Sequence, residues 1–264
     1  MPDVYIAPTA QGSADGTSAA NAYAYSSLSS AESDAGSGGT IFFTDGDYSF
    51  SSNPNWDANG VTYKSLNRLG AKIIGSGSVR VLNIGATGNT VAVTVSGFLF
   101  EDFVFDFFPP QDTSIIQTLE YCKATQTTSS SSAPITGTGG SLDRALVNFC
   151  ELSFKPSGGV FGSSTSNYTY KNSSFFFDLS ATSGISDPGT GAIISNNCIY
   201  STNDNTKWSH TLVSNATNCC FHNMGSTNSS GGTDNIFVDP LYVDPGSDLR
   251  LRPTSPCIGA GTAS

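Results

Sequence analysis

A four-residue segment recurs six times in this chain of 264 residues. In each copy the second residue is small or apolar, the fourth is apolar, and the residue between them varies. That alternation is typical of a β-strand with one buried face. The copies follow one another at a mean interval of about 23 residues, which is typical of a β-solenoid. They lie at residues 102–105, 121–124, 149–152, 172–175, 197–200 and 218–221.

Cysteine is the commonest residue at the second position of this repeat. Side chains stacked in successive coils lie about 4.8 Å apart, so we expect these thiols to act as small apolar core residues. A straight stack does not converge on one point as zinc ligands must, and we predict no metal site there. Cys220 is one residue out of phase and is expected to face the other way. The stacked cysteines are Cys122, Cys150, Cys198 and Cys219.

Asparagine stands at the first position in the last three copies, at Asn172, Asn197 and Asn218. Asparagine tolerates the left-handed backbone of a bend, and stacked amides can hydrogen-bond along the stack. We therefore expect these residues to have a structural role at one bend of each coil.

The composition favours one large all-β domain. Charged residues make up only 12% of the chain, and short apolar runs alternate with Gly, Ser and Asn turns, as in chains of many short strands. We assign an N-terminal strand and a capping helix at 25–35 to residues 1–39, a parallel β-helix to residues 40–236, and a C-terminal cap to residues 237–264. At about 23 residues a coil, the central region predicts eight or nine coils. The helix is expected to cover the open end of the stack.

Both ends of the chain resemble the right-handed parallel β-helix repeat proteins of the pectate-lyase-like superfamily. The resemblance rests on DPLYVDP at 239–245, DLRL at 248–251 and SPCIGAG at 255–261, although Gly259 stands where Asp is commoner. At the other end it rests on VYIAP at 4–8 and DGTS at 15–18. The resemblance implies a single-stranded, right-handed helix with three parallel sheets. It does not imply one activity, since this fold hosts lyases, hydrolases, adhesins and phage tailspikes.

The formal net charge of −10 disfavours several classes of partner. A nucleic-acid binder of the ordinary type needs a basic surface, and an anionic membrane surface would repel this chain. The sequence has no apolar run long enough to insert into a membrane, and no standard secretion signal is visible at the N-terminus. A neutral glycan, an anionic glycan bridged by a cation, or another protein remains as a partner.

One strip of carboxylates is the candidate catalytic site. Glu101 and Glu120 stand one place before the bend in successive copies, and Asp102 lies beside them. Stacked about 4.8 Å apart, two carboxylates suit a retaining glycosidase, and the same oxygens could hold Ca²⁺. The alternative is a solvated polar strip. Lys123 and Glu151, at outward positions of neighbouring coils, are expected to form a surface ion pair.

Four residues are candidates for binding. Exposed Tyr and Trp side chains stack on sugar rings and also anchor protein interfaces. We predict a binding surface that contains Tyr168, Tyr170, Lys171 and Trp208.

Three functional hypotheses follow. The first is a virion-associated protein that resembles a tailspike or tail fibre, is virion-bound or extracellular, forms a homotrimer, and binds a cell-surface glycan or another virion protein. The second is a polysaccharide lyase or glycoside hydrolase that acts at the carboxylate strip, and the third is a bacterial surface adhesin. An ice-binding solenoid would need a flat, regular Thr ladder, which the variable coil lengths do not predict.

Overall fold

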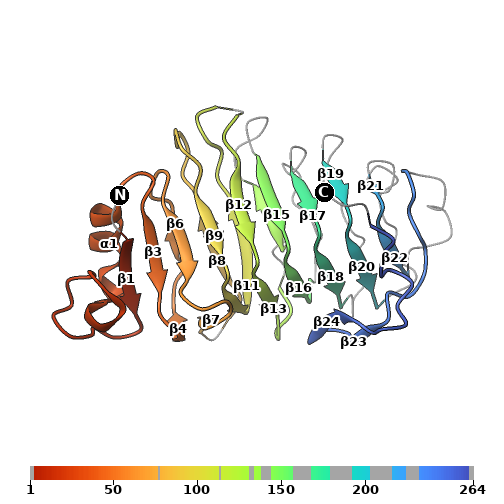
Figure 1. Ribbon diagram of the computed structural model, residues 1–264, viewed down its shortest axis with the longest axis horizontal. Coiled ribbons are helices and arrows are strands. Elements are labelled where there is room, and N and C mark those ends of the chain that lie inside the picture. Colours follow the sequence, from red (N-terminus) through yellow and green to blue (C-terminus); the bar gives the residue numbers. More distant parts are fainter. Residues whose placement is uncertain are drawn as a thin grey trace.

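The computed structural model describes residues 3–76, 78–112, 114–130, 134–137, 144–156, 168–178, 192–202, 216–223 and 232–261. It is an elongated parallel β-helix with one short helix at its N-terminal end (Figure 1). The expected all-β solenoid is confirmed. It has about six turns rather than the eight or nine that the repeat interval predicts.

Sheet A forms one long side of the helix. Apart from the first two strands, its members follow each other in chain order, one from each coil, and the described pairings are parallel. Its strands are β2 (Tyr23–Ala24), β1 (Asp3–Ala7), β3 (Thr40–Phe43), β6 (Thr62–Ser65), β9 (Thr94–Ser96), β12 (Gln117–Glu120), β15 (Ala145–Asn148), β17 (Thr169–Lys171), β19 (Ile193–Ser195) and β21 (Ala216–Thr217).

Two further parallel sheets complete the coils. Sheet B contains β4 (Gly46–Phe50), β7 (Ala71–Gly75), β10 (Leu99–Glu101), β13 (Lys123–Thr125), β16 (Glu151–Phe154), β18 (Ser174–Phe177), β20 (Cys198–Ser201) and β22 (Cys220–His222). Sheet C contains β5 (Asn55–Trp56), β8 (Arg80–Ile84), β11 (Phe103–Phe107) and β14 (Ile135–Gly137).

The core is a stack of the side chains that alternate inward along each strand. In sheet A, the column through Tyr63, Val95 and Leu119 is fully buried. Sheets B and C add many aromatic rings, and Phe100 packs edge-on against Phe105 with ring centroids 5.1 Å apart. Burial of each such side chain stabilises the fold by roughly 1.5–3 kcal/mol, and this apolar stack holds three narrow sheets together.

The bend between sheets A and B, which we call the A–B corner, repeats one backbone conformation. One residue per coil has a left-handed φ of 50° to 80°. The next residue points into the core. The left-handed residues are Gly97, Tyr121, Phe149, Asn172, Asn196 and Asn218.

This register corrects two of the six predicted copies. Asp102 also has a left-handed φ, 56°, but it lies between β10 and β11 at the bend from sheet B to sheet C. In the fifth copy the bend falls at Asn196. Asn197 is the inward residue and is buried, with 1% of its surface exposed. Both bends have a left-handed residue followed by a buried one, so the sequence pattern alone does not separate them.

The same shift changes the cysteine ladder. Cys122, Cys150 and Cys219 point inward at the A–B corner and are buried, as expected. Burial raises the pKa of the Cys122 thiol and raises that of Cys219 to about 11. Cys198 does not belong to this ladder, because it starts β20 and pairs with Cys220 on the outer face of sheet B. Cys220 faces away from the ladder, as predicted.

The N-terminal helix covers the end of the stack, as expected. Helix α1 (Leu28–Ala35) follows two 3₁₀ turns, Ala19–Asn21 and Tyr25–Ser27. Its Ala31 and Ala35 side chains are buried in the core cluster. The hydroxyl of Tyr63 donates a 2.6 Å hydrogen bond to the Glu32 carboxylate, which ties the helix to the second coil.

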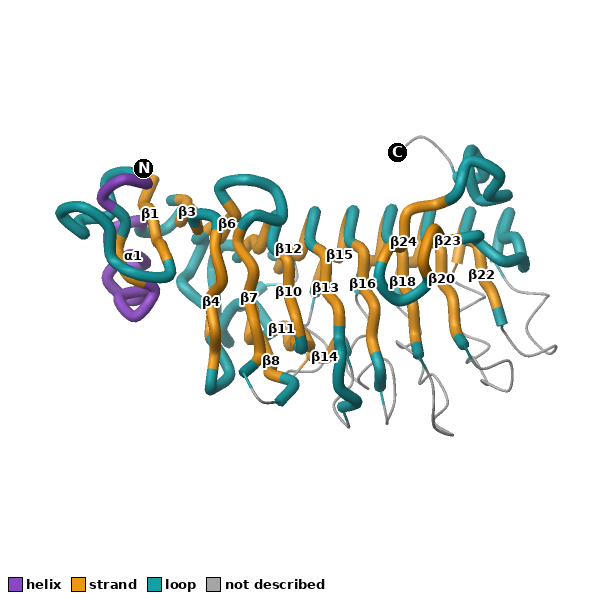
Figure 2. Tube along the Cα trace, turned by 90° about the horizontal axis from the view of Figure 1, so that it is seen from below, coloured by secondary structure: helices purple, strands orange, loops and turns teal. Residues whose placement is uncertain are grey.

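The C-terminal segment lies along the side of the β-helix. The antiparallel hairpin β23 (Tyr242–Asp244) and β24 (Asp248–Leu251) packs over β18 and β20 on the outer face of sheet B (Figure 2). Tyr242 and Leu249 cluster with Phe176, and the Tyr242 hydroxyl donates to the Cys198 carbonyl at 2.9 Å. The predicted C-terminal cap therefore covers a face of the last coils.

Candidate functional site

The predicted carboxylate strip does not form as expected. Glu101 ends β10 in sheet B, where its neighbours across the strands are Ile74 and Thr125. Glu120 ends β12 in sheet A, between Ser96 and Asn148. The two glutamates are not stacked neighbours, because Glu101 precedes the bend from sheet B to sheet C at Asp102, whereas Glu120 precedes the A–B corner at Tyr121.

Two of these carboxylates have structural partners. Glu101 forms a 2.8 Å ion pair with Lys72. Asp102 accepts hydrogen bonds from the backbone N–H groups of Thr127 and Thr128, at 2.7 and 3.1 Å, and from their hydroxyls. Asp102 therefore holds the start of the loop that follows β13. The Lys123–Glu151 ion pair was predicted correctly, with a separation of 3.5 Å.

Two of the predicted binding aromatics are core residues. Tyr168 and Tyr170 are 0% and 1% exposed, so their prediction as a sugar-binding surface was wrong. Strand alternation places Tyr170 inward in β17, and burial raises the pKa of its phenol. The Tyr168 hydroxyl donates to the Thr136 carbonyl at 2.9 Å. Trp208 lies outside the described residues.

Lys171 ends β17 on the outer face of sheet A. Its neighbours across the strands are Asn148 and Ser195. Asn172, the next residue, belongs to the A–B corner, so Lys171 lies beside the surface described below.

An exposed aromatic pair stands at the A–B corner. The rings of Tyr121 and Phe149 stack with centroids 5.1 Å apart and an interplanar angle of 3°. They remain 39% and 41% exposed, because a left-handed residue at a bend directs its side chain outward. Gly97 in the preceding coil has no side chain, and the Arg68 guanidinium lies 5.9 Å from the centre of the Tyr121 ring.

Amide side chains continue this row. Asn172 donates to Asn148 at 3.0 Å, and Asn196 donates to Asn172 at 3.2 Å. The predicted bonding of amides along the stack is thus confirmed for one pair, Asn172 and Asn196, with Asn196 in place of Asn197. We call the outward row of Arg68, Tyr121, Phe149, Asn172, Asn196 and Asn218 the corner ladder.

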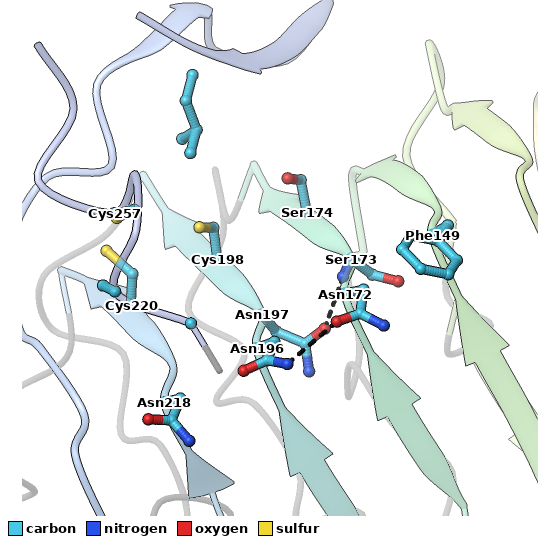
Figure 3. Close-up of a pocket in the computed structure, with 13 residues that line it drawn as sticks. Phe149, Asn172, Ser173, Ser174, Asn196, Asn197, Cys198, Asn218, Cys220 and Cys257 are labelled. Atoms are coloured by element: carbon cyan, nitrogen blue, oxygen red, sulfur yellow. Dashed lines mark hydrogen bonds between the residues drawn. The ribbon is translucent and has the colours of Figure 1, made fainter. Parts of the chain in front are cut away.

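A groove of about 270 Å³ lies between the corner ladder and the C-terminal tail. Phe149 and the three asparagines line one wall, and Leu251, Ala260 and Gly261 line the other. Figure 3 shows the asparagines following one another along the corner, with Cys198, Cys220 and Cys257 at the side of the tail. The groove therefore offers amide donors and acceptors next to an exposed aromatic pair.

The sequence contained a signal for this surface that the prediction did not use. Tyr121 and Phe149 occupy the repeat position where later copies carry asparagine. Asparagine, which tolerates left-handed backbone, marks that position as the bend. The left-handed backbone of the bend does not favour large aromatic residues. Tyr and Phe at this position therefore indicate exposed side chains with a binding role.

The outer face of sheet A carries a partial threonine column, which the sequence analysis did not expect. Thr40, Thr62, Thr94 and Thr118 are consecutive partners across four strands. Differences in coil length fall in the connections and leave the strand register intact. Leu146 interrupts the column before Thr169. The neighbouring column on the same face includes the charged residues Lys64, Glu120 and Lys171. The face is therefore not a uniform threonine array.

Within the described ranges, no group of three or more His, Cys, Asp or Glu side chains is arranged to hold a metal ion. Among the same residues, no helix has the length and apolar character needed to span a membrane. Comparisons of the chain with family models, curated proteins and solved structures find no significant match.

Proposed function

We propose that this protein is a glycan-binding β-helix protein and that the corner ladder is its binding surface. The supporting observation is the exposed, parallel stack of Tyr121 and Phe149 directly followed by a row of amides along a groove. An exposed aromatic ring is a surface on which the apolar face of a sugar ring packs. Asparagine amides supply both donors and acceptors for sugar hydroxyls.

The shape of the surface favours a linear glycan. Successive rungs of the ladder are about 4.8 Å apart along the helix axis, so the same groups recur in a straight line. A chain of sugar units lying parallel to this axis would contact the aromatic rungs with one unit and the amide rungs with the next. The net charge of −10 favours a neutral glycan over an anionic one.

Binding to neutral oligosaccharides tests this proposal. A glycan array would identify a ligand, and titration calorimetry would compare Tyr121→Ala and Phe149→Ala with the parent protein. We expect each substitution to weaken binding about tenfold, because an aromatic contact of this kind contributes up to about 1.5 kcal/mol.

The matched control is Phe42→Ala. Phe42 stacks on Tyr5 with centroids 5.4 Å apart and lies near the Lys64 ammonium, but at the N-terminal end of sheet A. The proposal predicts unchanged affinity in this variant. Full affinity in both corner variants, or an equal loss in the control, would count against the corner ladder.

The biological setting that we propose is a virion, where the protein recognises a cell-surface glycan or another virion protein as tailspikes and tail fibres do. The resemblance of the chain ends to pectate-lyase-like β-helix proteins and the low-charge solenoid support this setting. Light scattering after size exclusion tests the homotrimer that such spikes form, and immunogold labelling of virions tests the location.

A lyase or hydrolase remains the alternative function. The predicted site at Glu101, Asp102 and Glu120 does not have the stacked geometry on which this hypothesis was based. Glu101 is paired with Lys72, and Asp102 accepts hydrogen bonds from two threonines. Mass spectrometry of any oligosaccharide that binds, before and after long incubation, would show shortened or unsaturated products if the protein were catalytic.

A further inference from the structure

Three thiols from distant parts of the chain meet beside the groove. Cys198 and Cys220 are partners on adjacent strands of sheet B, with their side chains on the outer face. Cys257 belongs to the C-terminal tail and lines the same groove as the other two thiols (Figure 3). All three are free thiols. This cluster has no part in the proposed glycan contacts.

The docking of the C-terminal segment explains why the thiols meet. Tyr242 bonds to the Cys198 carbonyl, and the Ser255 hydroxyl donates to the Pro240 carbonyl at 2.6 Å. The Cys257 N–H in turn donates to the Ser255 hydroxyl at 3.1 Å. The chain that leads to Cys257 is therefore held by hydrogen bonds at Tyr242, at Ser255 and at Cys257 itself.

The three thiols are not equivalent. All three line the groove. Cys198 and Cys257 are half-buried, whereas Cys220 is buried and its thiol donates to the Val238 carbonyl at 3.4 Å. The neighbouring thiols, Cys198 first and then Cys220, lower the pKa of Cys257, and the same cluster raises the pKa of Cys198. A thiolate stabilised by donors in a half-exposed position is the reactive form of cysteine.

We propose that Cys257 and Cys198 form a thiol–disulfide exchange site that accepts a low-molecular-weight disulfide such as oxidised glutathione. The Cys257 thiolate attacks one sulfur of the disulfide, forms a mixed disulfide and releases one glutathione thiolate. The Cys198 thiol then loses its proton to solvent and attacks the Cys257 sulfur. The second glutathione leaves as thiolate, and a Cys198–Cys257 disulfide remains. The two protein thiols are oxidised and one glutathione disulfide is reduced to two thiols.

The product would pin the C-terminal tail to β20. Leu251, Ala260 and Gly261 of that tail form one wall of the groove. Exchange at this site would therefore fix the width of the groove without using any residue of the corner ladder.

The test treats the reduced, folded full chain with oxidised glutathione, blocks the remaining thiols and maps the peptides by mass spectrometry. Trypsin separates the three thiols, because Lys207 lies between Cys198 and Cys220 and Arg250 lies between Cys220 and Cys257. We expect a cross-link between peptides 172–207 and 251–264. Cys122 and Cys150 serve as internal controls, and Cys257 should react at least about tenfold faster than these buried thiols.

Two variants separate the roles. In Cys198→Ser the Cys257–glutathione mixed disulfide should accumulate, since the second thiol is missing, whereas Cys220→Ser should still form the cross-link. A native Cys257 that reacts no faster than Cys122 would overturn the proposal. A cross-link from Cys257 to Cys220 in the parent protein would overturn the assignment of Cys198 as its partner. Neither result bears on glycan binding, which the Tyr121 and Phe149 variants test.

Discussion

At the A–B corner, two asparagines join successive coils with the same pair of hydrogen bonds. Asn197 accepts from the Ser173 N–H at 2.9 Å and donates to the Tyr170 carbonyl at 2.8 Å. Asn235 accepts from the Cys219 N–H at 2.9 Å and donates to the Ala216 carbonyl at 3.0 Å. Each amide satisfies two backbone groups where the bend interrupts the strand ladder. At the Ala216 carbonyl the amide adds to a backbone hydrogen bond, because the Thr233 N–H also donates to this carbonyl at 3.1 Å.

We predict that Asn197→Ala lowers the free energy of unfolding by about 2–4 kcal/mol, because it removes both hydrogen bonds that the buried Asn197 amide makes to the backbone. Urea denaturation measures this change. Asn196→Gly is the control, since glycine accepts the left-handed backbone and the half-buried amide that is lost bonds to the Asn172 side chain rather than to the backbone. This variant should lose less than about 1 kcal/mol of the free energy of unfolding. Equal costs for the two variants would contradict the assignment of Asn197 as the buried bridge.

The Glu32 carboxyl makes the free energy of unfolding fall as the pH rises through the range in which this group ionises. Burial raises the pKa of this carboxyl above its ordinary value of 4.5, and the Tyr63 hydrogen bond offsets part of the rise. As the pH increases from 4.5, the unfolded chain releases the proton before the folded chain does. Folding therefore loses stability through this group until the pH exceeds its folded pKa.

We accordingly predict that Glu32→Gln gains stability relative to the parent protein between pH 4 and pH 7. Glutamine keeps an acceptor for the Tyr63 hydroxyl and carries no charge to desolvate. Urea denaturation of both proteins across this pH range measures the difference. A difference that stays constant or shrinks as the pH rises would show that Glu32 is not the group responsible.

The element with the greatest influence on the proposed site is the β23–β24 hairpin. Leu249 is 3% exposed and packs with Tyr242 on Phe176. Lys123 donates to the Ser247 carbonyl at 2.7 Å, which ties the hairpin to a strand several coils away. The hairpin thus covers apolar surface of sheet B and holds the tail that lines the groove.

We predict that Leu249→Ala costs about 2 kcal/mol or more, as expected for loss of a buried leucine side chain. The loosened hairpin should also give less hydrogen-exchange protection to β18 and β20 and faster alkylation of Cys198. Val243→Ala, on an exposed side chain of the same hairpin, should change stability by less than about 0.5 kcal/mol. Unchanged Cys198 alkylation in Leu249→Ala would mean that the hairpin does not control access to the thiols.

As a whole, the molecule is a one-dimensional stack in which each coil mainly contacts its neighbours. Helix α1 covers one end, and residues at the other end extend the stack through single bridges, including Cys220 to Ile236. In such a stack the coils near an end with few neighbours open first. The C-terminal segment counters this opening because it lies across β18, β20 and β22. The proposed Cys198–Cys257 disulfide would add a covalent link.

We predict that the oxidised chain is more stable to urea than the reduced chain by about 2–4 kcal/mol, as for a disulfide that closes a long loop. The parent protein is compared with and without oxidised glutathione. Cys198→Ser should show no such gain. An equal gain in that variant would assign the effect to another thiol.

The sequence by itself determined the solenoid, the buried thiols Cys122, Cys150 and Cys219, and the helix at its end. Those features depend on alternation within a strand and on a repeat interval, and both are local properties of the chain. The tertiary structure decided which bend each segment makes, since Asp102 and Tyr121 share one backbone conformation at different corners. It also placed Tyr121 beside Phe149 and Cys257 beside Cys198. Such neighbours depend on register between coils and on the docking of the tail, which no local pattern encodes.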